Sequence, residues 1–162
     1  MRKYGVVLAL VVVSVAVWVA SAAAIRGPQT FSLLAVDNGK GQPFNNFMFD
    51  RAPVAGDQFP ISEDLYKWAG TKRGAKVGSD RGAAEFLVVT NNGANGWAVF
   101  NVQANLPGGT IIVSGQSAIE QGPSKFTLAV TGGTGIYANA RGYVKVRGMA
   151  GNKTNLDFHL LP

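Results

Sequence analysis

The feature that most constrains the fold is a succession of short segments in which apolar and polar residues alternate. β-Branched and aromatic residues are common in these segments, and clusters of Gly, Asn and Pro separate them. A period of two is typical of β-strands, and the clusters are typical of turns. The pattern predicts strands over residues 30–36, 44–50, 83–90, 97–104, 110–117, 126–131, 143–148 and 155–161.

The segment "ISEDLYKWAG", residues 61–70, is the exception after the N-terminus. Ser62 is followed by two acidic residues, which is the order found at the start of a helix. The sequence therefore predicts one or two helical turns here.

Tight turns join most of the predicted strands. "TNNGANG" (90–96), "NLPGG" (105–109) and "GMAGNKTN" (148–155) contain the residues that hairpin turns need. Strands joined in this way form an antiparallel meander, and closure into a barrel removes its exposed edges. We predict an all-β, eight-stranded antiparallel closed barrel, whose interior is either packed or holds one small ligand.

Residues 1–24 have the layout of a secretory signal peptide. Arg2 and Lys3 precede an apolar run over residues 4–20, and the small residues of "SAAA" follow it. The alternative is an uncleaved membrane anchor, because the run approaches the roughly 20 residues that span a bilayer. In either case we expect residues 25–162 to form one domain in a secreted, periplasmic or otherwise extracytoplasmic location. Contact with the membrane is expected only through an uncleaved leader.

Several classes of function are excluded by composition. The chain has no Cys, and His159 is its single His, so thiolate sites and two-histidine metal sites are ruled out. The nucleophile motif G-x-S-x-G is absent. The formal charge is +6, to which the leader contributes two, and the basic residues are scattered apart from "KRGAK" (72–76). We interpret that cluster as a solvated loop and predict no nucleic-acid partner.

The glycine-rich stretch "FTLAVTGGTGIYANARG", residues 126–142, could be read as a phosphate-binding loop. A dinucleotide fingerprint requires a helix after the glycines, with its N-terminus facing the phosphates. Asn139 and Gly142 interrupt any helical pattern after Gly135. We therefore predict that residues 131–142 form the corner between two antiparallel strands.

Together with "PGGTIIVSG" (107–115), this stretch resembles the C-terminal half of the allene oxide cyclase and dirigent superfamily. The correspondence rests on Gly109–Val113, Gly132–Tyr137 and Ala140–Gly142, and upstream on Leu65-Tyr66, Val77-Gly78 and Gly82.

The resemblance implies an eight-stranded barrel, often trimeric, whose open interior holds a hydrophobic small molecule. Members of the superfamily cyclise or isomerise such molecules, or steer their coupling, without a metal or organic cofactor. The resemblance thus implies a hydrophobic ligand, a homotrimer and, where there is activity, a cofactor-independent cyclase or isomerase or a dirigent-type coupling protein. The alternative is a non-catalytic secreted or envelope barrel that acts as a structural or oligomerising module.

Two catalytic candidates follow from the resemblance. Asp37 ends the first predicted strand, where the cyclases carry an important carboxylate, although it also opens the turn "DNGKG". Arg141 matches the arginine of the family's A-R-G motif, although an arginine at a strand start is equally often solvated. Ile136 stands where many dirigent proteins have a polar residue, which argues against dirigent-type coupling.

Alternation leaves two arrangements of the barrel wall. If the polar faces line the interior, Asn101 and Tyr143 contact the ligand. If the polar faces meet solvent, as is usual in soluble proteins, Phe100 and Phe158 line an apolar interior.

Overall fold

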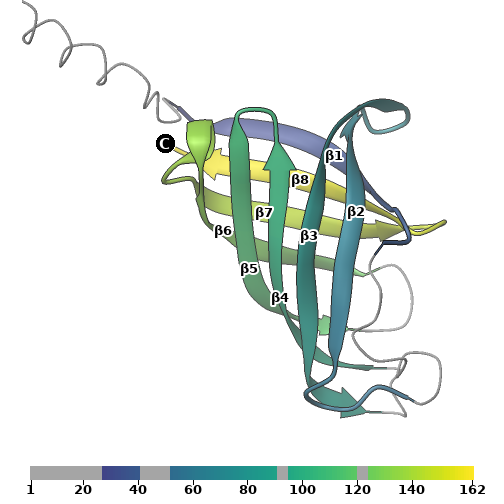
Figure 1. The fold of residues 1–162 in the computed structure, drawn as a ribbon. Coiled ribbons are helices and arrows are strands. Elements are labelled where there is room, and N and C mark those ends of the chain that lie inside the picture. Colours follow the sequence, from purple (N-terminus) through teal and green to yellow (C-terminus); the bar gives the residue numbers. More distant parts are fainter. Residues whose placement is uncertain (1–26, 41–51, 91–94, 120–123) are drawn as a thin grey trace, which may run out of the picture.

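The computed structural model describes residues 27–40, 52–90, 95–119 and 124–162. These residues form an antiparallel barrel in which each strand pairs with the next and the last pairs with the first (Figure 1). The strands are β1 (Gln29–Asp37), β2 (Gln58–Trp68), β3 (Arg73–Thr90), β4 (Asn95–Leu106), β5 (Gly109–Ile119), β6 (Lys125–Gly133), β7 (Arg141–Met149) and β8 (Lys153–Leu161). The predicted all-β, closed, eight-stranded barrel is confirmed.

The second strand of the barrel is not the one predicted. The helical turns expected over residues 61–70 are wrong, because this segment belongs to β2 and pairs with both β1 and β3. Ile61, Glu63 and Leu65 share the inner face of that strand, and Leu65 is fully buried. The period-two pattern and the two rows of backbone pairs outweigh the helix-start signal at Ser62. The strand predicted over 44–50 lies outside the described residues.

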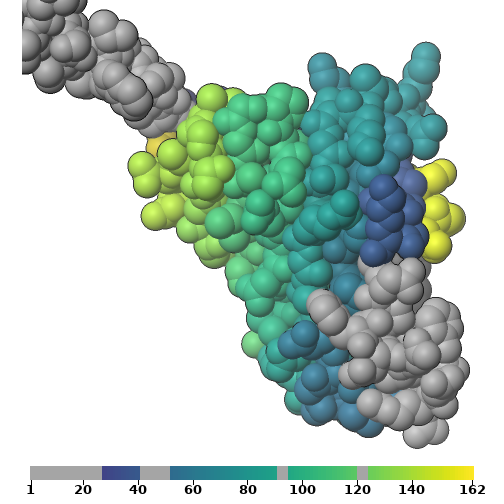
Figure 2. Space-filling model, in the orientation of Figure 1, coloured from purple at the N-terminus to yellow at the C-terminus, as the bar shows by residue number. Residues whose placement is uncertain are grey.

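The solvated loop expected at residues 72–76 is only half right. Arg73 to Lys76 already belong to β3, but their side chains are exposed. They lie at the end of the β2–β3 hairpin, which stands out from the barrel in Figure 2. Arg73 packs its guanidinium carbon 4.7 Å from the centre of the Tyr66 ring, which fixes the hairpin on its outer side.

The inner faces of the strands form one apolar core. Phe100, Phe158 and Leu160 point inward, whereas Asn101 and Gln103 are exposed on the outer wall. The polar-outward arrangement is therefore the one that the structure adopts. Two stacked ring pairs strengthen the interior: Phe31 with Phe158 at 5.0 Å, and Phe100 with Phe126 at 4.8 Å.

The core fills one end of the barrel and leaves the other hollow. The closed end holds core residues that line no cavity, where β2, β4, β6 and β8 finish; these are Leu33, Ala35, Leu65, Ile111, Val130, Ala140 and Leu160. The opposite end, where β1, β3, β5 and β7 finish, contains the cavity described below. The packed core thus lies at one end of the barrel, and the cavity lies at the other.

The glycine-rich segment is a corner between two antiparallel strands, as predicted, and joins β6 to β7 through the 3-10 helix η2 (Gly135–Tyr137). It lies at the closed end of the barrel. Gly135 has a positive φ of 60°, and an added Cβ would lie 1.9 Å from the carbonyl oxygen of Gly108. Ile136 donates its backbone N–H to the same carbonyl. The side chain of Ile136 covers Gly108, at 2.8 Å from an ideal Cβ there. These glycines allow two turns to dock against each other, which is a structural role.

The part of the chain that the structure describes contains no helix long and apolar enough to cross a membrane.

Candidate functional site

The open end of the barrel contains a cavity of about 650 Å³. This volume falls in the range of small-molecule sites, about 300–1,000 Å³. The wall is mostly apolar and all eight strands contribute to it, with Phe86, Phe100, Val113, Phe126, Val144 and Phe158 among its members. Small side chains such as Ala84 and Ala104 keep the space open.

Two carboxyl groups interrupt the apolar wall. Glu63 on β2 and Asp80 on β3 are direct partners in the β2–β3 ladder, so both side chains point into the cavity from neighbouring strands. Asp80 is 2% exposed, and a hydrogen bond joins the two carboxyl groups. Such a bond requires that one of them carries a proton.

Burial raises the pKa of Glu63 to about 8, and the charge of Asp80, the hydrogen bond to it and the charge of Asp37 contribute further. Burial also raises the pKa of Asp80 to about 6, against the opposing effects of the hydrogen bond with Glu63 and the positive charge of Arg81. The proton of the pair therefore belongs to Glu63 near neutral pH. A neutral acid beside a carboxylate is an arrangement suited to proton transfer.

One oxygen of the pair has spare bonding capacity. Oδ1 of Asp80 is buried and receives no hydrogen bond from the amide, hydroxyl or basic groups of the described residues. A buried acceptor without a donor is costly, unless the neighbouring carboxyl proton satisfies it.

Asp37 lies at the mouth of the cavity, in the same row of paired residues as Glu63 and Asp80. It pairs with Glu63 across β1 and β2, so three acidic residues lie side by side on β1, β2 and β3. Asp37 is exposed, and its Oδ1 accepts the backbone N–H of Gly39 at 2.8 Å. Asp37 thus opens a turn and also lines the cavity, and its catalytic role stays a prediction. Lys153 lines the mouth as well.

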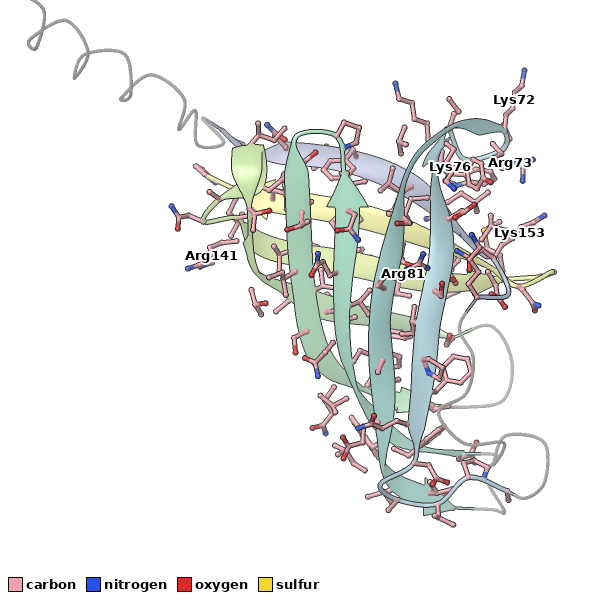
Figure 3. All side chains as sticks on the ribbon, viewed as in Figure 1. Lys72, Arg73, Lys76, Arg81, Arg141 and Lys153 are labelled. Atoms are coloured by element: carbon pink, nitrogen blue, oxygen red, sulfur yellow. The ribbon has the colours of Figure 1, made fainter. Side chains whose placement is uncertain are left out.

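The outer side of the same strands carries a polar network behind the pair. Ser62 accepts a hydrogen bond from Arg81 and donates one to Asn38 at 2.9 Å. Next to it, Lys76 forms an ion pair with Asp64 at 2.8 Å. Figure 3 shows Arg81 and Lys76 on these strands. The network connects β1, β2 and β3, and so fixes the strands that carry Asp37, Glu63 and Asp80.

The other candidates from the sequence divide between the two sides of the wall. Phe100 and Phe158 line the cavity. Asn101 is exposed and accepts a hydrogen bond from Ser114, and Tyr143 stacks on His159 at 4.6 Å, so neither belongs to the cavity lining. Arg141 is exposed at the closed end and donates to the carbonyls of Thr131 and Ala140, far from Lys153 (Figure 3).

Sequence reasoning missed Glu63 and Asp80. Reading residues 61–70 as helical placed Glu63 in a first helical turn, and Asp80 preceded the strand predicted from residue 83. The available signal was the period-two series Ile61, Glu63, Leu65, in which an acid occupies an apolar face. Among the described residues no cluster of three acidic, His or Cys side chains has the geometry of a metal site.

The fold and this site define a class: small closed barrels with an apolar cavity at one end and acidic groups on its wall. A family model, the allene oxide cyclase barrel-like domain, matches residues 48–159. The chain belongs to this family.

Solved structures agree with this assignment. Pyocyanin demethylase is 29% identical, with a TM-score of 0.59 over 79% of this chain and 98% of that one. A pterocarpan synthase dirigent protein is 14% identical, with a TM-score of 0.56 over 82% and 84%. An exo-specific intermolecular Diels-Alderase is 14% identical, with a TM-score of 0.57 over 82% and 97%. The last two likenesses concern the fold alone. Among curated proteins, no sequence matches the chain.

Proposed function

We propose that the barrel binds a hydrophobic small molecule in its cavity and steers its isomerisation or cyclisation by proton transfer. The observation that carries the proposal is the Glu63–Asp80 pair in an otherwise apolar cavity of about 650 Å³. The wall orders a flexible substrate into one conformer, and the pair acts on the atoms held beside it.

The two carboxyl groups together supply one proton and accept one proton. Protonated Glu63 donates its proton to an oxygen or nitrogen of the substrate, while ionised Asp80 removes a proton from another position. The substrate gains and loses one proton, so the step requires no oxidant and no cofactor. Charge that develops on the substrate is held in an apolar surrounding, where electrostatic stabilisation is strong.

The test compares substitutions in the pair with a matched change outside it. Glu63→Gln and Asp80→Asn remove the titratable groups, and Glu85→Gln makes the same change on the outer wall, where Glu85 contacts Gln58. Molecules that co-purify with the wild-type protein are extracted, identified by mass spectrometry and offered back as substrates.

We expect Glu63→Gln and Asp80→Asn to abolish conversion of such a molecule, and Glu85→Gln to leave conversion unchanged. Binding that persists with no conversion in the wild-type protein would favour the non-catalytic alternative. A purified barrel that binds neither extracted molecules nor apolar aromatic probes would contradict the proposal.

A second candidate is demethylation of pyocyanin, in which a water oxygen adds to the N-methyl carbon, this carbon leaves as formaldehyde, and the phenazine ring takes up the two electrons. The 29% identity to pyocyanin demethylase over nearly that whole chain favours it. Pyocyanin is coloured, so its binding and conversion can be followed by absorbance, with the demethylated product identified by mass spectrometry. Release of a demethylated product that depends on Glu63 and Asp80 would support this candidate. Binding without demethylation would leave only the first proposal.

We also propose that the protein is exported and assembles as a homotrimer. The basic and apolar leader supports export, and family membership supports the assembly. Residues 1–24 are proposed to be removed, which leaves one domain over 25–162. The mass of the protein recovered outside the cytoplasm tests the cleavage, and light scattering tests the assembly.

A further inference from the structure

Charged residues are unevenly distributed over the outer wall of the barrel. They make up 15% of the chain, yet none occurs between Glu85 and Glu120 or between Lys125 and Arg141. As a result β4 and β5 contain no charged residue, and β6 contains only Lys125, its first residue. These three strands are neighbours in the sheet, and Figure 1 shows β4 and β5 side by side at the front of the barrel. We call their outer face the neutral wall.

The neutral wall presents apolar side chains, amides and hydroxyls to solvent. Trp97 at the start of β4 is 46% exposed, and Ile112 on β5 is 40% exposed. The outward-facing residues around them on these two strands are Val99, Asn101, Gln103, Ser114 and Gln116. On β6 the wall continues with Thr127, Ala129 and Thr131. The surface of a soluble protein usually carries interspersed charges, and their depletion around exposed apolar residues is typical of a protein–protein interface.

Charged residues border the neutral wall on both sides. Arg81 and Glu85 lie on β3, where they pair with residues of β4, and Lys145 on β7 pairs with Thr127 of β6. A charge-free centre inside a charged rim is the usual anatomy of an interface.

The size of the neutral wall agrees with this interpretation. Its strands have 9 to 12 residues. At about 3.3 Å per residue and about 4.8 Å between strands, the three strands cover roughly 500 Å². Specific interfaces bury about 800 Å² on each partner. The neutral wall therefore has the size of the central part of such an interface.

The charge of the chain favours a second copy as the partner. The formal net charge is +6, and it stays positive without residues 1–24, so two copies repel each other wherever their charged walls meet. The neutral wall is the surface over which two copies approach without that repulsion. An acidic partner of a different kind would instead gain from contacts with the basic residues of β3 and β7. Amides such as those of Gln103 and Gln116 both donate and accept hydrogen bonds, so the same face suits each copy.

We propose that a second copy of this chain docks on the neutral wall, with Ile112 of the middle strand in the contact. The inference rests on the proposed assembly, to which it adds the face that is used. It is independent of the catalytic proposal, because neither Ile112 nor Gln116 lines the cavity.

The experiment compares the wild-type protein with three lysine variants. Ile112→Lys and Gln116→Lys each place a charge at an exposed position of β5, the middle strand of the neutral wall. Thr30→Lys is the control, because it adds the same charge at an exposed position of β1, outside the neutral wall. Light scattering after size-exclusion chromatography measures the mass of each protein over a range of concentrations.

We expect the wild type and Thr30→Lys to assemble equally. Ile112→Lys and Gln116→Lys should weaken the assembly at least about tenfold, because like charges would meet or lose water in the contact. Far-UV circular dichroism spectra of both β5 variants should match that of the wild type, which separates loss of assembly from loss of fold.

The possible failures can be told apart. Equal assembly of the wild type and both β5 variants would overturn the inference and leave the proposed assembly standing. Dissociation of Thr30→Lys together with the β5 variants would also overturn it, since added charge alone would explain the effect. A wild type that is monomeric at every concentration would contradict both the inference and the proposed assembly. If that monomer bound phosphatidylcholine vesicles and Ile112→Lys did not, the neutral wall would be a lipid-binding face instead.

Discussion

Asp80 stays ionised beside Glu63 because the two carboxyl groups, paired across β2 and β3, share a proton that Glu63 holds more tightly. Burial is the main cause for both groups, and the folded protein binds protons that the unfolded chain would release. Stability should therefore depend on pH in a defined direction.

The folded-state pKa of Glu63 is raised from 4.5 to about 8, so its contribution favours folding at low pH. In this window the folded state binds more protons than the unfolded state, and the free energy of unfolding falls as pH rises. Glu63→Gln removes this dependence. Its melting temperature should match that of the wild type near pH 4.5 and exceed it by roughly 10 °C or more near pH 8.

Circular dichroism melts at several pH values measure this difference in melting temperature. Glu85→Gln is the control, and its difference from the wild type should not change with pH. A difference between Glu63→Gln and wild type that stays constant from pH 4.5 to pH 8 would contradict the raised pKa.

The glycine-rich corner offers a contrast within one tetrapeptide. Gly135→Ala places a Cβ 1.9 Å from the Gly108 carbonyl at a positive φ, whereas Gly132 has nothing within 4 Å of an ideal Cβ. Gly135→Ala should lower the free energy of unfolding by about 2–4 kcal/mol or prevent folding, and Gly132→Ala should change it by less than about 0.5 kcal/mol. Urea titrations of the two variants provide the comparison; equal stabilities would show that the corner adapts.

Phe158 has a double role as core residue and cavity wall. It is 2% exposed and stacks on Phe31, so Phe158→Ala should cost about 3–5 kcal/mol. Phe59 also lines the cavity but is 41% exposed, so Phe59→Ala should cost less than about 1.5 kcal/mol. Chemical denaturation distinguishes them. Similar losses for both would mean that the ring stack contributes little.

Filling the cavity should block binding without unfolding the barrel. Val102 lines the cavity between Phe100 and Ala104 on β4, and a larger ring there projects into open space. Val102→Phe should reduce the affinity for a cavity ligand at least about tenfold and leave the melting temperature within a few degrees of wild type. Titration with pyocyanin, followed by absorbance, or with the extracted ligand measures the affinity. Unchanged binding would mean that the ligand binds outside the cavity.

The strand pattern made the barrel predictable, because alternation and turn residues are local signals. The motif at Gly132 to Gly142 also marked the family. The site was harder to predict from the sequence, because the pairing of Glu63 with Asp80 depends on the register of β2 against β3. Their raised pKa values depend on burial that only the closed barrel creates. The alternating pattern predicted that Phe100 and Phe158 line the interior. It did not reveal Glu63, because residues 61–70 were interpreted as helical.

The pairing of β1 with β8 also has a kinetic consequence. Ser32 and Asp157, joined by a hydrogen bond, are 125 positions apart in the chain, so ring closure requires a contact of very high sequence separation. Such contacts form slowly, and the hollow end of the barrel cannot exclude water until they do. The acids on its wall reach their raised pKa values only at that moment. Uptake of protons near neutral pH should therefore accompany the final step of folding, and a pH indicator in a stopped-flow refolding experiment would time the closure of the barrel.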